Sequence, residues 1–89
     1  MPKKVDTNQA EIVDALRKAG ASVFDLHEVG RGLPDILVGY RNKNYLMEIK
    51  YKKGVLNAKE NDFFDNWQGQ AIVVYTAEQA LRVIKIYSR

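Results

Sequence analysis

The chain has 89 residues, 46% of them hydrophobic and 28% charged, which suits one small folded domain and leaves no room for a second. With no cysteine and a single histidine, disulfides, thiolate catalysis and cysteine- or histidine-rich metal sites are excluded. A bound metal would therefore need oxygen ligands. The net charge of +3 permits nucleic-acid binding but does not demonstrate it.

The sequence also bears on location. No apolar stretch approaches the ~20 residues that span a bilayer. The first residues, Met-Pro-Lys-Lys-Val-Asp, do not lead into the hydrophobic segment of a secretion signal. We therefore expect no membrane contact and a cytoplasmic location.

In chain order, the first predicted element is a helix over Asn8–Ala19, capped by Asp6 or Thr7 and ended by Gly20. A short strand (Ser22–Leu26) and a glycine-rich loop (His27–Pro34) follow. The remaining expected elements are strands at Ile36–Tyr40 and Tyr45–Ile49, a helix at Ala58–Gln68, a strand at Ala71–Tyr75, and a helix that opens at a capping-box sequence (Thr76–Gln79) and runs to about Ile84. This αβββαβ order with a C-terminal helix predicts a single α/β domain over residues 1–89, with a mixed central sheet flanked by helices.

The candidate catalytic residues are Asp35, Glu48 and Lys50, which lie at or next to the ends of the strands Ile36–Tyr40 and Tyr45–Ile49. If these strands form a hairpin with its turn centred between Asn42 and Lys43, Asp35 lies opposite Lys50. Alternation along each strand then places all three candidates on one face. The opposite face carries the apolar residues Ile36, Val38, Met47 and Ile49.

Two carboxylates in such a position need a compensating charge. At about 4 Å they repel by ~4 kcal/mol at an effective dielectric near 20. One acid is protonated, Lys50 neutralises part of the charge, or a hard cation such as Mg²⁺ or Mn²⁺ joins the two. Water on such a cation could attack a phosphorus atom, with Lys50 orienting the water or balancing the charge. The alternative interpretation is a surface salt bridge between Lys50 and one acid.

The spacing of these residues is similar to that of a known family. Pro34-Asp35, followed after twelve residues by Glu48-Ile49-Lys50, resembles the motif of the PD-(D/E)XK nuclease superfamily. The segments Gly32–Gly39 and Trp67-Gln68-Gly69 resemble the VRR-NUC branch, in particular its small stand-alone members in phages and bacteria. The resemblance runs from about Asn8 to Leu81.

The resemblance implies a role for each motif residue. Asp35 and Glu48 would be metal ligands, the main-chain carbonyl of Ile49 a third ligand, and Lys50 the catalytic lysine. It also implies a restriction-endonuclease-like core, DNA cleavage that depends on Mg²⁺ or Mn²⁺, and a preference for branched or structured DNA, as in Holliday-junction resolvases.

Two polar residues depart from the family pattern. Related resolvases often have a glutamate on the first helix that faces the site; here Glu11 falls on the polar stripe, whereas Gln9 shares the inward stripe. Glu60 takes an inward position where the family often has glutamine. We expect Gln9 and Glu60 to lie just behind the metal ligands with these roles exchanged; alternatively, both merely reach solvent past the edge of the core.

Basic and aromatic residues complete the candidate site. Arg31, Lys52 and Lys53 flank it and are predicted to contact the DNA backbone; the alternative is ordinary solubilising charge. His27 is interpreted as a surface group. The aromatic residues are expected in the core and in interfaces, not as base-stacking platforms: Tyr40, Tyr45, Phe63, Phe64 and Trp67.

The function expected from these features is a divalent-metal-dependent, structure-selective DNA endonuclease. No recognition helix or zinc-finger spacing is present to read bases, so DNA shape is the expected target. Because a small protomer covers little duplex, we expect a homodimer that cuts four-way junctions in a bacterial or phage-infected cell. The alternatives are a catalytically idle DNA-binding module of the same fold and a protein-interaction domain.

Overall fold

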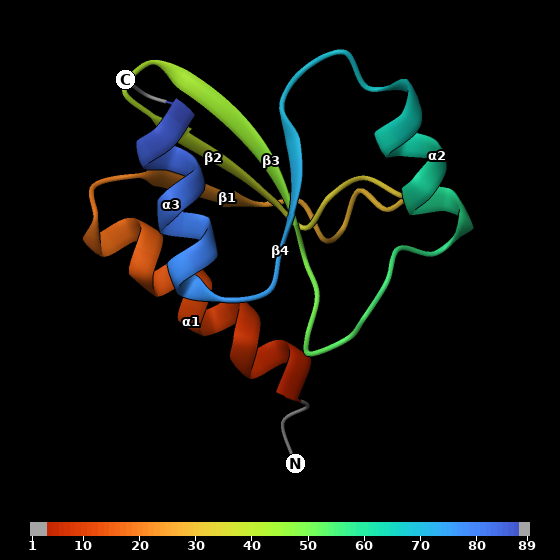
Figure 1. Ribbon diagram of the computed structural model, residues 1–89, viewed down its shortest axis with the longest axis horizontal. Coiled ribbons are helices and arrows are strands. Elements are labelled where there is room, and N and C mark those ends of the chain that lie inside the picture. The colour runs from red at the N-terminus through yellow and green to blue at the C-terminus, as the bar shows by residue number, and fades with distance from the viewer. Residues whose placement is uncertain (1–3, 88–89) are drawn as a thin grey trace.

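The computed structural model describes residues 4–87, and side chains from Thr7 to Ile86. The predicted element order is confirmed, and the fold is α/β (Figure 1). The elements are α1 (Lys4–Lys18), β1 (Ser22–Asp25), β2 (Ile36–Tyr40), β3 (Lys43–Ile49), α2 (Ala58–Asn66), β4 (Ala71–Val74) and α3 (Ala77–Tyr87). Among the described residues, no helix has the length and apolar character needed to cross a bilayer.

The four strands form one mixed sheet in the order β1-β2-β3-β4. β1, β2 and β3 are antiparallel neighbours, whereas β4 is parallel to β3 and is reached through α2. Helices α1 and α3 lie together on one side of the sheet, and α2 stands apart from them (Figure 1). This arrangement leaves the second face of the sheet to α2 and the loops beside it.

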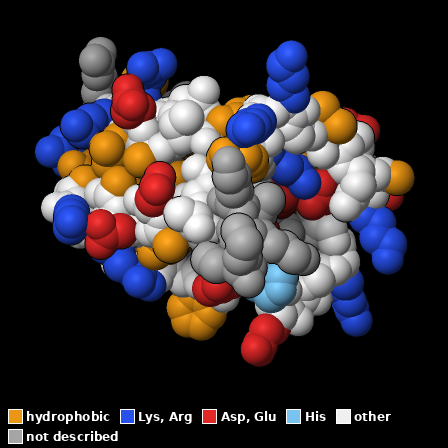
Figure 2. All heavy atoms as spheres, turned by 90° about the horizontal axis from the view of Figure 1, so that it is seen from below, with side chains coloured by type: hydrophobic (Ala, Val, Ile, Leu, Met, Phe, Trp, Pro, Cys, Tyr) orange, Lys and Arg blue, Asp and Glu red, His pale blue; other side chains and the backbone are white. Residues whose placement is uncertain are grey.

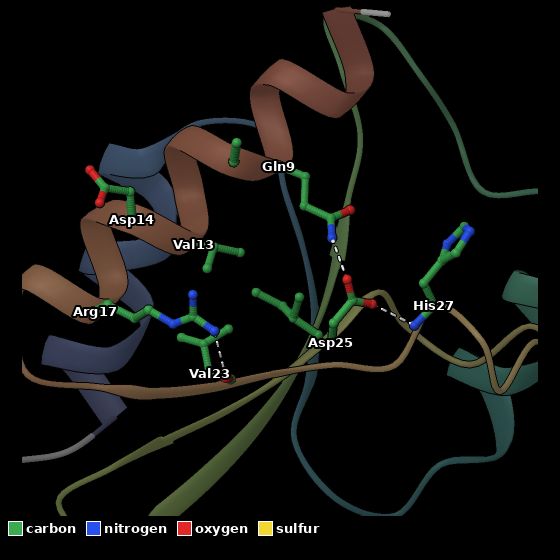
Figure 3. A pocket seen from close by; sticks show the side chains of 9 residues that line it. Gln9, Val13, Asp14, Arg17, Val23, Asp25 and His27 are labelled. Atoms are coloured by element: carbon green, nitrogen blue, oxygen red, sulfur yellow. Dashed lines mark hydrogen bonds between the residues drawn. The ribbon is translucent and has the colours of Figure 1, made fainter. Parts of the chain in front are cut away.

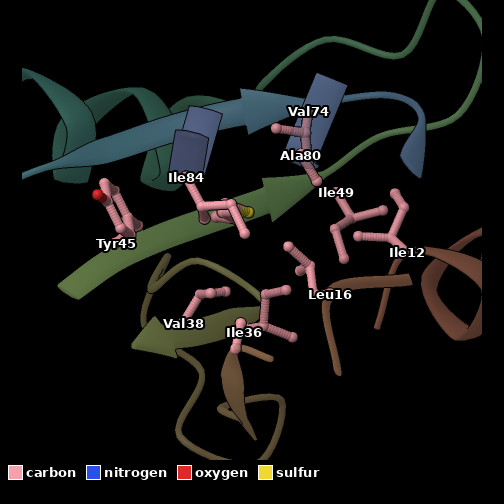
Figure 4. Packing of buried hydrophobic residues seen from close by; sticks show 11 residues of the cluster. Ile12, Leu16, Ile36, Val38, Tyr45, Ile49, Val74, Ala80 and Ile84 are labelled. Atoms are coloured by element: carbon pink, nitrogen blue, oxygen red, sulfur yellow. The ribbon is translucent and has the colours of Figure 1, made fainter. Parts of the chain in front are cut away.

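The hydrophobic core lies between the sheet and the α1–α3 pair (Figure 4). Alternate residues of β2 and β3 point into it, so the predicted apolar face is confirmed. Burying these side chains is the main stabilising contribution in a domain of this size. The fully buried apolar side chains include Ile12, Leu16, Ile36, Val38, Tyr45, Met47, Val74 and Ile84.

Helix α1 differs from its prediction at one end. It begins at Lys4, about one turn before the expected start, so Asp6 and Thr7 lie inside the helix and do not cap it. The predicted end at Gly20 is confirmed: Gly20 has φ +99°, its N–H donates to the Arg17 carbonyl (3.0 Å), and the next N–H donates to the Leu16 carbonyl (3.0 Å). These are the two bonds of a Schellman motif, which ends a helix at a left-handed residue.

The turn between β2 and β3 lies one residue earlier than predicted. Its central residues are Arg41 and Asn42, with φ of 50° and 65°, and Tyr40 is paired with Lys43. Positive φ at both positions defines a two-residue type I′ turn, whose twist matches that of a hairpin. The prediction of a turn centred between Asn42 and Lys43 is therefore wrong, and each residue of one strand pairs with a partner two positions earlier than predicted.

Helix α2 attaches to the molecule without contributing to its core. None of its residues is buried. Phe63 stacks on Trp67, with ring centroids 5.1 Å apart, and meets Phe64 edge-on at 6.2 Å. Of the aromatic residues expected in the core and in interfaces, Tyr45 lies in the core and Tyr40 packs against it. Phe63, Phe64 and Trp67 lie outside the core and pack on one another, so an interface role stays a prediction for them.

Candidate active site

Asp35, Glu48 and Lys50 meet at one end of the β2–β3 hairpin. Asp35 directly precedes β2, Glu48 is the second-to-last residue of β3, and Lys50 directly follows β3. Continuing the observed register past the Ile36–Met47 pair puts Asp35 opposite Glu48, and not opposite Lys50 as predicted. The shared face survives this correction because the pairing partner changes by two residues, which preserves the alternation.

Asp35 is fixed by the neighbouring strand. Its Oδ2 accepts a hydrogen bond from the main-chain N–H of Ile49 at 2.7 Å. Burial raises the pKa of Asp35, although this hydrogen bond, the Glu48 carboxyl and the Lys50 charge each act to lower it. The side chain is thereby oriented toward the end of β3, where Glu48 and Lys50 lie.

Glu48 is the most buried charged residue that the structure describes, with 3% of its surface exposed. Its Oε2 lies 3.3 Å from Lys50 Nζ, and its Oε1 is buried without a hydrogen-bond partner. Burial, the Asp35 charge and Glu60 raise the pKa of Glu48 to about 8, against the opposing effect of Lys50. An unpaired buried carboxylate oxygen costs free energy unless a proton or a cation satisfies it.

Lys50 connects Glu48 to α2 through Glu60. Its Nζ lies 2.8 Å from Glu60 Oε1, and the prediction that Glu60 points inward is confirmed by this contact. Burial acts to lower the pKa of Lys50, but the hydrogen bond to Glu60 and the Glu48 charge outweigh it and raise that pKa. Burial acts to raise the pKa of Glu60, but hydrogen bonds from Lys50 and the Asn57 N–H outweigh it and lower that pKa. Lys50 therefore remains an ammonium group between two acids.

The main chain of Ile49 faces the same space as the two acids. The N–H of Lys50 donates to the Val74 carbonyl in β4 (3.0 Å), whereas the N–H of Ile49 points the other way, to Asp35. In an extended strand the N–H and C=O of one residue point to the same side. The Ile49 carbonyl is therefore directed to the Asp35 side.

The oxygen atoms of this site could supply part of the coordination shell of a hard cation. Oxygen donors on Asp35, Glu48 and the Ile49 carbonyl are the ligands that Mg²⁺ and Mn²⁺ prefer, with water completing the shell. The unpartnered Oε1 of Glu48 is the strongest sign of such a site. Within residues 4–87 no cluster of three or more His, Cys, Asp or Glu side chains has a metal-binding arrangement, so the set relies on a main-chain oxygen.

Gln9 makes its hydrogen bond outside this cluster. Its Nε2 donates to Asp25 Oδ2 (3.4 Å), and Asp25 Oδ1 accepts from the His27 N–H (2.7 Å). These residues line a cavity of about 490 Å³ between α1 and β1 (Figure 3). Among the described residues, Gln9 has no hydrogen bond to Asp35, Glu48 or Lys50, so the structure does not bring it into direct contact with the acids.

The three predicted DNA-contacting residues lie on loops beside the site. Arg31, Lys52 and Lys53 are all exposed, Arg31 in the loop before Asp35 and the two lysines just after Lys50. Lys52 Nζ lies 5.3 Å from the centre of the Tyr51 ring. Figure 2 shows Lys and Arg side chains interspersed with Asp and Glu on the visible face, without a uniformly basic stripe.

Asn8 is a positioning residue that the sequence analysis missed. Its Nδ2 donates to the main-chain carbonyls of Lys50 (3.0 Å) and Tyr75 (3.1 Å), so it ties the start of α1 to the ends of β3 and β4. The Tyr75 hydroxyl donates to the Gly54 carbonyl (2.8 Å) and fixes the loop after Lys50. The available signal was the position of Asn8 one turn before Ile12, which puts an amide on the buried stripe of the helix.

No protein-family model matches the chain, and neither a curated protein nor a solved structure matches it at a significant level.

Proposed function

We propose that this chain is a divalent-metal-dependent DNA endonuclease of the VRR-NUC type, within the PD-(D/E)XK superfamily. The observation that carries the proposal is the buried, unpartnered Glu48 Oε1, which lies beside Asp35 at the same end of the hairpin. The resemblance of Pro34-Asp35 and Glu48-Ile49-Lys50 to the family motif supports it.

Each residue of the site then has a chemical task. Asp35, Glu48 and the Ile49 carbonyl would hold Mg²⁺ or Mn²⁺, which when bound supplies an acidified water and neutralises phosphate charge. The Lys50 ammonium, kept protonated by Glu48 and Glu60, offers a donor and a positive charge to the oxygens of the reacting phosphate. Asn8 keeps the Lys50 main chain in place.

A homodimer acting on branched DNA is part of the proposal, as is a cytoplasmic location in a bacterial or phage-infected cell. Two copies would bring two sites to the two equivalent strands of a four-way junction. An exposed apolar surface supports self-association: Phe24 is 69% and Trp67 47% exposed, and a groove of about 390 Å³ runs past Leu33, Leu37 and Leu46.

The proposed activity is tested with a synthetic four-way junction and a linear duplex in Mg²⁺ or Mn²⁺. Wild type should cut the junction and lose activity in a chelator. Asp35→Asn and Lys50→Ala should each lower the cleavage rate by at least about 100-fold while DNA binding persists. Lys85→Ala, which removes an exposed lysine from α3, is the matched control and should cut at the wild-type rate.

Three results would contradict the proposal. Binding without cutting in every metal would identify an idle DNA-binding module. Cutting that is unchanged in Asp35→Asn would place the chemistry elsewhere. The groove at Leu37 and Trp67 also suits a protein partner, and negligible or salt-insensitive DNA binding would favour that protein-interaction role.

A further inference from the structure

A tight left-handed turn precedes Asp35. The Leu33 N–H donates to the Gly30 carbonyl (3.1 Å), and the central residues Arg31 and Gly32 have φ of 61° and 77°. Glycine adopts this conformation freely, but a residue with a Cβ atom does so at a cost. Arg31 is therefore an unfavourable choice for the backbone at this position, as Arg41 is in the β2–β3 turn.

The turn packs against α2, next to the candidate site. A Cβ atom on Gly32 would lie 2.5 Å from the main-chain oxygen of Lys59. Lys59 precedes Glu60, which contacts Lys50. The loop that carries Arg31 therefore packs closely on the first turn of α2, which also holds Glu60 beside Lys50.

The Arg31 guanidinium has no partner among the described residues, and it is exposed to solvent. Among the other described arginines, Arg17 donates to the Val23 carbonyl (3.2 Å) and Arg41 lies 5.3 Å from the centre of the Tyr40 ring, whereas the exposed Arg82 of α3 has no such contact, like Arg31. Five donors in a planar fork are therefore available for an external ligand, and this geometry matches the oxygens of a phosphate group.

We propose that Arg31 binds a DNA backbone phosphate adjacent to the one that is cleaved, and that the left-handed turn holds the guanidinium at that position. This inference rests on the proposed nuclease function and adds a specific substrate contact to it. A phosphate that approaches Asp35 and Glu60 is repelled by their negative charge, and an arginine on the neighbouring loop offsets that repulsion. The contact is to the backbone, so it carries no base preference.

Arg31→Gly tests the inference, because glycine relieves the backbone and removes the guanidinium together. Binding to a labelled four-way junction is measured by fluorescence anisotropy over a range of salt concentrations, with Ca²⁺ in place of Mg²⁺ to limit cutting. The variant should melt at the same or a higher temperature than wild type. Its affinity should fall by about tenfold, and the slope of log affinity against log salt should decrease by about one.

The hairpin turn offers a matched control. Arg41 occupies the same first central position of a type I′ turn, with φ 50°, at the opposite end of the hairpin from the site. Arg41→Gly relieves the same backbone conformation but also loses the contact with Tyr40, and it should change the affinity by less than about twofold. Arg31→Gln, which keeps the backbone and removes the charge, repeats the affinity test independently of folding effects.

The outcomes separate the two proposals. If wild type binds DNA but Arg31→Gly and Arg31→Gln bind with wild-type affinity and salt slope, Arg31 has no phosphate contact and the nuclease proposal stands. If Arg31→Gly and Arg41→Gly weaken binding equally, the effect is one of net charge and the inference is wrong. If wild type binds no DNA, both proposals fail.

Discussion

The Glu48 carboxyl group is enclosed by Asp35, Lys50 and Glu60 and has little access to water. Its one positively charged neighbour, Lys50, is shared with Glu60 and satisfies only one of its oxygens. Removing a carboxylate from water is costly unless its charge is matched. In the absence of a cation, the protein meets this cost by keeping Glu48 protonated up to a pH of about 8.

A pH dependence of stability follows for the metal-free protein. The pKa of Glu48 is about 8 in the fold and 4.5 ordinarily, so between these values the folded chain binds more protons than the unfolded chain. Its contribution is fully present below pH 4.5 and is lost as the pH rises through about 8. The free energy of unfolding should therefore fall from pH 5 to pH 8, by up to about 1.4 kcal/mol per pH unit.

Urea unfolding in a chelator at several pH values measures this trend. Glu48→Gln, which stays neutral, should flatten the profile, and Mg²⁺ added at pH 8 should stabilise wild type but not the variant. An identical pH profile for wild type and Glu48→Gln would show that Glu48 is not the group responsible.

Residue positions were predictable where they depended on periodicity alone. The common face of Asp35, Glu48 and Lys50 follows from alternation, and the inward direction of Glu60 follows from helical spacing. The bonds from Asn8 to Lys50 and from Gln9 to Asp25 were not predictable, because each joins segments that only the tertiary fold brings together.

At the scale of elements, α2 is held mainly by its first turn. Asn57 and Glu60 form a reciprocal capping box, and the same Glu60 carboxylate binds Lys50. No residue of α2 is buried. These polar contacts and the close packing of Gly32 against the Lys59 main chain therefore provide much of the contact between α2 and the rest of the molecule. The position of Glu60 in the site and the position of α2 are therefore coupled.

Substitutions of Glu60 separate its capping role from its charge. Glu60→Ala removes the capping bond and the ion pair, and should lower the free energy of unfolding by about 1–2 kcal/mol. Glu60→Gln can still accept from the Asn57 N–H and should cost less. Asp62→Ala, on the exposed side of the same helix, is the control for chemical denaturation. Equal losses for Glu60→Gln and Glu60→Ala would assign the whole effect to the charge.

Gly32 provides a second test at the scale of elements. Gly32→Ala combines a positive φ with a clash against the Lys59 main chain, whereas Gly30→Ala has a positive φ but open space. We expect Gly30→Ala to cost about 1 kcal/mol and Gly32→Ala at least 1 kcal/mol more, by analogy with other strained positions. Hydrogen exchange should show faster exchange in α2 for Gly32→Ala only. Equal destabilisation by Gly30→Ala and Gly32→Ala, with equal exchange in α2, would mean that the turn does not pack on α2.

The boundaries of elements were less predictable than their order. The β2–β3 turn was misplaced by one residue because Asn42 suits either turn position, and only pairing across the hairpin decides between them. Whether Phe63 and Trp67 belong to the core or to an interface was not predictable, because their spacing shows that they share a face but not which surface that face meets.

At the scale of the whole molecule, the proposed homodimer predicts a solution mass near twice the 10.2 kDa of one chain. The exposed apolar side chains of the second sheet face supply a surface for this association. Light scattering coupled to gel filtration at micromolar concentration measures the mass directly. A mass of one chain, with or without a DNA junction present, would remove the dimer from the proposal.

The account depends most on a cation bound between Asp35 and Glu48, and anomalous scattering from a crystal soaked in Mn²⁺ tests it most directly. We predict a peak about 2 Å from Glu48 Oε1, Asp35 and the Ile49 carbonyl, with Lys50 Nζ displaced from Glu48 but still at the site. The absence of a peak in a fully soaked crystal, with Lys50 still bound to both glutamates, would contradict it.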